Sequence, residues 1–106
     1  MKRVSKYGAV PTIVDNVRFA SKREATHYGY LKILEQRGKI RDLELQPRYR
    51  LEVNGELICT YVADFKYFDV AWNAVMIEDC KGFKTPAYIL KKKLMKAIHG
   101  IEIREV

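Results

Sequence analysis

Hydrophobic residues at helical spacing mark the first strong element of the chain. The stretch Ser21-Lys22-Arg23-Glu24 has the form of a capping box, in which a serine and a glutamate satisfy free amides at a helix start. Apolar side chains follow at helical spacing, at Tyr28, Leu31 and Leu34, and Gly38 then supplies a stop signal. The pattern predicts a helix over residues 21–37.

Alternation of bulky and polar residues predicts three strands after this helix. The first covers residues 43–53 with an interruption near Pro47, and Asn54-Gly55 is a strong signal for a two-residue hairpin turn. The next strand covers residues 57–68, and a third covers residues 74–81 after a short connection. We expect the three strands to form an antiparallel meander.

The end of the chain predicts a second helix and a final strand. Thr85 followed by Pro86 is typical of an N-cap with proline at the first helical position. An apolar stripe follows at Ala87, Leu90, Leu94 and Ala97 or Ile98, and Gly100 closes the helix. Residues 101–106 alternate as a strand. Because a helix between two strands favours a right-handed crossover, we expect this strand to lie parallel to a neighbour.

These elements predict an α/β fold in the order α-β-β-β-α-β, with a mixed central sheet flanked by helices. The 106 residues fit one domain, and 48% hydrophobic with 31% charged residues is typical of a globular protein. Residues 1–20 read as a basic N-terminal arm with a short strand at 12–19 around the turn Asp15-Asn16. No apolar run has the length of a membrane span, and none follows Met1-Lys2-Arg3, so we expect a cytoplasmic protein.

The charge balance favours a polyanionic partner. Twenty Lys and Arg against thirteen Asp and Glu give a net charge of +7. Clustered basic charge on a small domain favours nucleic acid, and no amphipathic membrane helix is evident. The alternative is a solvated basic surface that serves solubility. The candidate DNA-binding residues are Lys2, Arg3, Lys6, Lys22, Arg23, Lys84, Lys91, Lys92, Lys93 and Lys96.

Two acids and a lysine form the candidate chemistry. Asp79 and Lys81 share one face of the strand at 74–81, and Asp64 ends another apolar run at a matching depth. Charged groups on a buried face are costly unless they are paired or bind a cation. Two carboxylates can hold Mg²⁺ and a lysine can orient or deprotonate water, as phosphodiester hydrolysis requires. Simple ion pairing is the alternative for each residue.

The residues and the element order together resemble the PD-(D/E)XK nuclease superfamily, and more closely a group of small phage-borne proteins of that type. The matching positions are Glu24 on the first helix, Asp64 on the second strand and Asp79-Cys80-Lys81 on the third. Ala63 replaces the proline of the superfamily name. The Gln-x-x-x-Tyr signature of many exonucleases in this superfamily is absent after Lys81, which favours an endonuclease.

The resemblance implies a restriction-endonuclease-like core and a Mg²⁺ (or Mn²⁺) site. Asp64, Asp79 and the Cys80 carbonyl are the implied metal ligands, Lys81 positions the water, and Glu24 binds in the outer sphere. The implied activity is a DNA endonuclease for branched DNA, similar to Holliday-junction resolvases. A non-catalytic DNA-binding module of a phage replication or recombination complex is the alternative, and a homodimer is left open.

Several candidate residues have an alternative interpretation. Capping the first helix also explains Glu24. Glu78 would replace Asp79 if the strand register moved by one residue, and Gln46 is a further candidate neighbour of the site. His27 lacks a partner at metal-ligand spacing, as does His99, so both are expected at the surface. The cysteines, Cys59 and Cys80, have no metal-binding or redox spacing and are expected to be buried free thiols.

Overall fold

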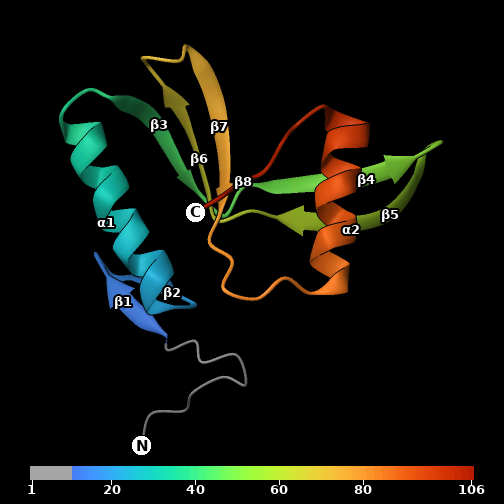
Figure 1. Ribbon diagram of the computed structural model, residues 1–106, viewed down its shortest axis with the longest axis horizontal. Coiled ribbons are helices and arrows are strands. Elements are labelled where there is room, and N and C mark those ends of the chain that lie inside the picture. The colour runs from blue at the N-terminus through green and yellow to red at the C-terminus, as the bar shows by residue number, and fades with distance from the viewer. Residues whose placement is uncertain (1–10) are drawn as a thin grey trace, which may run out of the picture.

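The computed structural model describes residues 11–106, and the predicted basic residues Lys2, Arg3 and Lys6 lie outside this range. Two helices flank a mixed sheet in a small α/β domain (Figure 1). The elements are β1 (Thr12–Val14), β2 (Val17–Phe19), α1 (Lys22–Gln36), β3 (Ile40–Leu45), β4 (Arg48–Val53), β5 (Glu56–Val62), β6 (Phe65–Asp69), β7 (Ala74–Asp79), α2 (Pro86–Leu94), η1 (Met95–His99) and β8 (Arg104–Glu105).

Local signals determine the N-terminal elements. Strands β1 and β2 form a hairpin whose turn residues Asp15 and Asn16 have φ of 51° and 62°, a conformation that Asp and Asn tolerate well. Ser21 then caps α1, because its side chain accepts a hydrogen bond from the Glu24 amide. The predicted short strand and first helix are thus confirmed.

The main sheet has the order β3-β6-β7-β8. Strand β6 pairs antiparallel with both β3 and β7, and β8 pairs parallel with β7. The expected parallel last strand is therefore confirmed. It is shorter than predicted, because only Arg104 and Glu105 have ladder geometry.

The predicted interruption near Pro47 is confirmed, but the prediction of one continuous strand over residues 57–68 needs correction. Both strands break at the same level, at Gln46-Pro47 and at Ala63-Asp64, so β4 and β5 form a separate two-stranded sheet. The hairpin remains bonded through the break, where Gln46 N–H donates to the Asp64 carbonyl and Ala63 N–H to the Pro47 carbonyl. Gln46 has a φ of 53°, and proline has no amide to continue a ladder. The chain bends here, and β4–β5 project away from the main sheet (Figure 1).

The predicted helix over 87–98 is divided into two parts. Thr85 caps α2 by accepting a hydrogen bond from the Tyr88 amide. Helix α2 continues as the π-helical turn η1, which ends at Gly100 with a φ of 68°.

Strand β7 ends at Asp79, so Lys81 lies just beyond the strand rather than inside it. No helix within residues 11–106 is long and apolar enough to cross a membrane.

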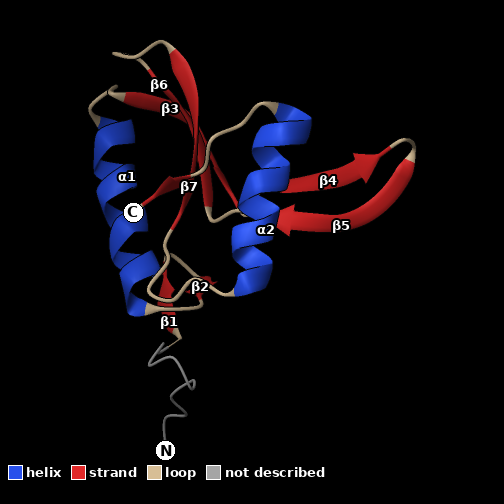
Figure 2. Ribbon diagram, turned by 45° about the vertical axis from the view of Figure 1, so that its right-hand side comes forward, coloured by secondary structure: helices blue, strands red, loops and turns tan. Residues whose placement is uncertain are grey.

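The two faces of the main sheet carry two separate cores. Helix α1 packs on one face, and α2 with η1 packs against β4, β5 and the other face (Figure 2). The α1 core contains Phe19, Ala25, Tyr28, Leu31, Ile40, Phe65 and Tyr67. The α2 core contains Leu51, Tyr61, Ala63, Ile77, Tyr88, Met95 and Ile103. The strand break at Ala63-Asp64 lies where these two cores meet.

Candidate functional site

The register of β6 and β7 brings two aspartates together. Phe65 pairs with Glu78 in this antiparallel ladder, and the Asp64 amide donates to the Glu78 carbonyl at 3.1 Å. One residue beyond this pair, Asp64 therefore lies opposite Asp79. The two carboxyl groups come from the start of one strand and the end of its neighbour, at the point where the sheet divides.

The Asp79 side chain is fully buried, and only one of its two carboxylate oxygens has a hydrogen-bond partner within residues 11–106. The Tyr61 hydroxyl donates a hydrogen bond to its Oδ2. Its Oδ1 lies 3.2 Å from Lys81 Nζ, yet this oxygen has no hydrogen-bond partner within residues 11–106. The Lys81 ammonium also lies 4.6 Å from the centre of the Tyr88 ring, in cation–π geometry. A buried carboxylate oxygen with spare acceptor capacity suits a bound cation.

Asp64 is half-buried beside Asp79 and is held by the backbone of the neighbouring strand. Its Oδ2 accepts a hydrogen bond of 2.7 Å from the Cys80 amide. Burial, followed by the hydrogen bond and the negative charge of Asp79, raises the pKa of Asp64 from its usual 3.8 to about 8, while the hydrogen bond from the Cys80 amide opposes the shift. With a pKa of about 8, the Asp64 carboxyl favours its protonated form at neutral pH, and a cation bound beside it would favour the ionised form.

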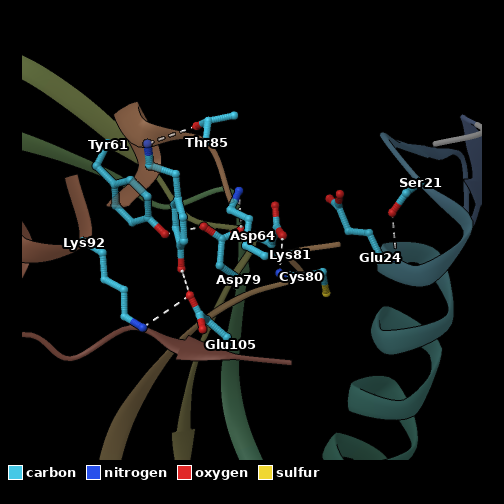
Figure 3. Close-up of polar contacts among 11 residues, drawn as sticks. Ser21, Glu24, Tyr61, Asp64, Asp79, Cys80, Lys81, Thr85, Lys92 and Glu105 are labelled. Atoms are coloured by element: carbon cyan, nitrogen blue, oxygen red, sulfur yellow. Dashed lines mark hydrogen bonds and ion pairs between the residues drawn. The ribbon is translucent and has the colours of Figure 1, made fainter. Parts of the chain in front are cut away.

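Glu24 extends from α1 toward this pair (Figure 3). The side chain is 6% exposed, and burial followed by the charge of Asp79 raises its pKa, while Lys81 opposes the shift. The Glu24 amide donates to the cap residue Ser21, and a hydrogen bond from the Ala20 backbone lowers the pKa of the Glu24 carboxyl. The carboxylate is thus held near the start of α1 while it extends toward the aspartate pair (Figure 3).

Glu78 points to the opposite face of the sheet. Its Oε1 accepts a hydrogen bond from His27 Nε2 at 2.7 Å, and its Oε2 accepts one from the Tyr67 hydroxyl at 2.6 Å. Arg104 lies 3.7 Å away as an ion-pair partner. These donors satisfy Glu78, so Asp79 and not Glu78 lies beside Asp64. His27, expected at the surface, is instead half-buried, and Glu78, which is far away in sequence, is its hydrogen-bond partner.

Gln46 and the two cysteines were the remaining candidates from the sequence. Gln46 contributes its amide to the strand break, and its side chain is exposed. Cys59 and Cys80 are free thiols, as expected, but both are half-buried rather than buried. Burial, followed by the charge of Asp64, raises the pKa of the Cys80 thiol to about 12, so this thiol is a poor nucleophile.

Ion pairs divide the candidate DNA-binding residues into two groups. Lys84 and Lys92 pair with Glu105 at 2.9 and 3.2 Å, and Lys96 pairs with Glu102 at 3.0 Å. Lys84, Tyr88 and Lys92 all bond to Glu105, and together they lower the pKa of this carboxyl to about 2. The candidates without an ion pair in the described part of the chain are Lys22, Arg23, Lys91 and Lys93.

Sequence reasoning missed two tyrosines of the site. Tyr61 donates to Asp79, and Tyr88 donates to Glu105 at 2.7 Å while its ring lies under Lys81. Their rings lie 6.5 Å apart in the α2 core. The only sequence signal was an aromatic residue in an apolar strand or helix, which core packing explains equally well.

The metal-ligand inventory of the site is small. Within residues 11–106 no group of three or more His, Cys, Asp or Glu side chains has the geometry to hold a metal ion. The aspartate pair supplies two carboxylates, one with a buried oxygen that lacks a hydrogen bond. Hard cations such as Mg²⁺ are commonly held by one or two carboxylates and several waters, so this donor set fits such an ion.

Comparison with known proteins assigns the chain to a family. A family model described as "Protein of unknown function (DUF1064)" matches residues 4–104, and the chain belongs to this family. No curated protein and no solved structure matches the chain significantly.

Proposed function

We propose that the protein is a divalent-metal-dependent DNA endonuclease of the PD-(D/E)XK type. The observation that carries the proposal is the pair of half-buried Asp64 and fully buried Asp79, with Lys81 3.2 Å from Asp79. The mixed sheet with α1 before it and a helix before its parallel last strand supports a restriction-endonuclease-like topology. These three residues are among the positions on which the sequence resemblance depends.

In this proposal Asp64, Asp79 and the Cys80 carbonyl hold Mg²⁺ or Mn²⁺. The ion, when bound, polarises the phosphate and stabilises the leaving oxygen. Asp64 would have to give up its proton to hold the ion, because metal ligands must be deprotonated. Tyr61 is a positioning residue, since its hydroxyl fixes the orientation of the Asp79 carboxylate.

Lys81 and Glu24 act on the attacking water. The Lys81 ammonium, restrained between Asp79 and the Tyr88 ring, orients this water toward the phosphorus. Glu24 accepts a hydrogen bond from water in the outer sphere, for which its orientation toward the pair is suited. Hydrolysis forms a bond from water oxygen to phosphorus and breaks one phosphorus–oxygen ester bond, so one product keeps the phosphate and the other gains a hydroxyl.

We propose branched or structured DNA as the substrate, in phage DNA recombination, replication or processing in the host cytoplasm. The sequence resemblance to small phage-borne proteins supports the setting. A domain of 106 residues has little surface for reading a long sequence. The net charge of +7 supports a nucleic acid partner.

A cleavage assay on plasmid, single-stranded and four-way-junction DNA tests the proposal, with Mg²⁺ and with EDTA. We expect cleavage in Mg²⁺ only, and a loss of at least about 100-fold in rate for Asp79→Asn and for Lys81→Ala. Asp42→Asn is the matched control, because Asp42 is an exposed aspartate on β3. Wild-type rates in Asp79→Asn would refute the site. Tight binding without cleavage in Mg²⁺ and Mn²⁺ would instead favour a non-catalytic DNA-binding module.

A further inference from the structure

A pocket lies next to the aspartate pair, on the side of α1. It has a volume of about 450 Å³, within the range of small-molecule sites. Its lining residues are Lys22, Arg23, Thr26, His27, Tyr30, Cys80 and Val106. Cys80 joins the pocket to the site, because it lines the pocket while its amide binds Asp64. The pocket and the aspartate pair are therefore adjacent.

The rim of the pocket carries uncompensated positive charge. Lys22 and Arg23 are exposed, and neither forms an ion pair within residues 11–106. They differ in this from Lys84 and Lys92, which share an ion pair with Glu105, and from Lys96, which pairs with Glu102. An anionic group in the pocket would therefore meet two cations without displacing a protein carboxylate.

The wall of the pocket offers an aromatic surface. Tyr30 is 56% exposed, so the face of its ring is accessible from the pocket that it lines. The His27 ring lies 5.9 Å from the Tyr30 ring and 5.4 Å from the Phe65 ring. The hydrogen bond to buried Glu78 holds His27 in place. The His27 ring is thus anchored in the core, whereas the exposed Tyr30 ring can stack against a planar ligand.

Cations beside an exposed ring are the elements of single-stranded nucleic acid recognition. We propose that this pocket binds one unpaired nucleotide of the substrate strand, next to the phosphate that is cleaved. Lys22 and Arg23 contact its phosphate, and Tyr30 stacks on its base. A paired base has its faces covered by its neighbours in the duplex, so stacking on Tyr30 selects DNA with an unpaired nucleotide at the cleavage position, such as a junction, flap or single strand. This inference rests on the proposed function.

Binding of a short single-stranded oligonucleotide tests the inference, with 2-aminopurine as the reporter base and Ca²⁺ in place of Mg²⁺ to prevent turnover. Tyr30→Ala should lose about 5- to 100-fold in affinity for this oligonucleotide, because stacking on the ring is lost. Blunt duplex DNA should bind to both proteins equally. Tyr30→Phe should retain the affinity and the quenching of 2-aminopurine. Trp72→Ala is the matched control, since Trp72 is a 78% exposed ring in the β6–β7 turn at the far end of the sheet (Figure 1).

The charges of the rim give an independent readout. Replacing Lys22 and Arg23 by Gln should flatten the log–log salt dependence of single-strand binding by about 0.7 for each lost phosphate contact. Equal affinity of wild type and Tyr30→Ala for the single strand would overturn the inference. A poly-glutamate peptide that binds with the same dependence on Tyr30 would also overturn it, in favour of an acidic protein partner.

The outcome is separable from that of the proposed function. Cleavage by wild-type protein and its loss in Asp79→Asn decide whether the protein is a nuclease. Tyr30-dependent binding and 2-aminopurine quenching decide whether the pocket holds an unpaired base. Cleavage without Tyr30-dependent binding would reject this pocket alone, and Tyr30-dependent binding without cleavage would reject the nuclease alone.

Discussion

The substitution Asp64→Asn should stabilise the metal-free protein and abolish its stabilisation by Mg²⁺. Folding raises the pKa of Asp64 from 3.8 to about 8, so the carboxyl must take up a proton to be buried at pH 7. The upper limit of this cost at pH 7 is about 4 kcal/mol. Solvent around the half-buried side chain lowers it to about 1–2 kcal/mol. Asparagine is neutral and of similar shape, and it avoids this cost.

The pH dependence has a definite sign. Because the folded protein binds this proton more tightly than the unfolded chain, its stability is highest below pH 3.8 with respect to this group. The contribution is lost as the pH rises toward 8. Metal-free wild-type protein should therefore lose stability relative to Asp64→Asn between about pH 4 and pH 8, and the difference should level off above pH 8.

Thermal unfolding in EDTA and in Mg²⁺ measures both effects. In EDTA at pH 7 the melting temperature of Asp64→Asn should be several degrees higher than that of wild type, at about 4 °C or more per kcal/mol. Mg²⁺ at 100 times its dissociation constant should stabilise wild type by about 2.7 kcal/mol and leave the variant unchanged.

Asp42→Asn is again the control, because Asp42 has a φ of 58° that asparagine also tolerates and its side chain is 83% exposed. This variant should respond to Mg²⁺ like wild type. A metal-dependent rise of equal size in Asp64→Asn, or a lower melting temperature of that variant in EDTA, would refute the assignment of the pair as a cation site.

Three further predictions concern the surroundings of the pair. Tyr61→Phe removes the donor to buried Asp79, so we expect a loss of about 1–3 kcal/mol in urea unfolding and about 10- to 100-fold weaker metal binding in a Mn²⁺ titration. Glu24→Gln leaves the amide that caps α1 intact, so cleavage should slow with no fall in melting temperature; parallel losses of both would leave Glu24 with a structural role alone. Replacing Lys91 and Lys93 by Gln should flatten the log–log salt dependence of duplex DNA binding by about 0.9 per lost phosphate contact. An unchanged slope would indicate that duplex DNA binds along the α1 side instead.

Much of the fold could be predicted from the sequence because its signals are local. The N-cap residues Ser21 and Thr85 specify where the helices begin, whatever packs against them. The turns at Asp15-Asn16 and Asn54-Gly55 need backbone conformations that few other residues adopt. Alternation along residues 74–79 determined which acid shares a face with Ile77. This periodicity placed Asp79 beside Asp64 before any contact was known.

Other features depend on contacts between residues that are far apart in the chain. The strand over 57–68 has no internal break signal, and it divides because its partner bends at Gln46-Pro47 and two cores compete for its side chains. His27 and Glu78 are 51 residues apart, and no spacing rule pairs them.

The pairing of the charges near the site also depends on contacts between residues that are far apart in the chain. Sequence alone presents the lysines of the second helix as one basic stripe. The return of the chain through β8 places Glu105 against Lys84 and Lys92 and leaves Lys91 and Lys93 without an ion pair in the described part of the chain. Local sequence thus determined the elements and the order of the acids. The tertiary structure decided which charges are buried, which are paired and which remain available, because burial and pairing depend on neighbours that the fold brings together.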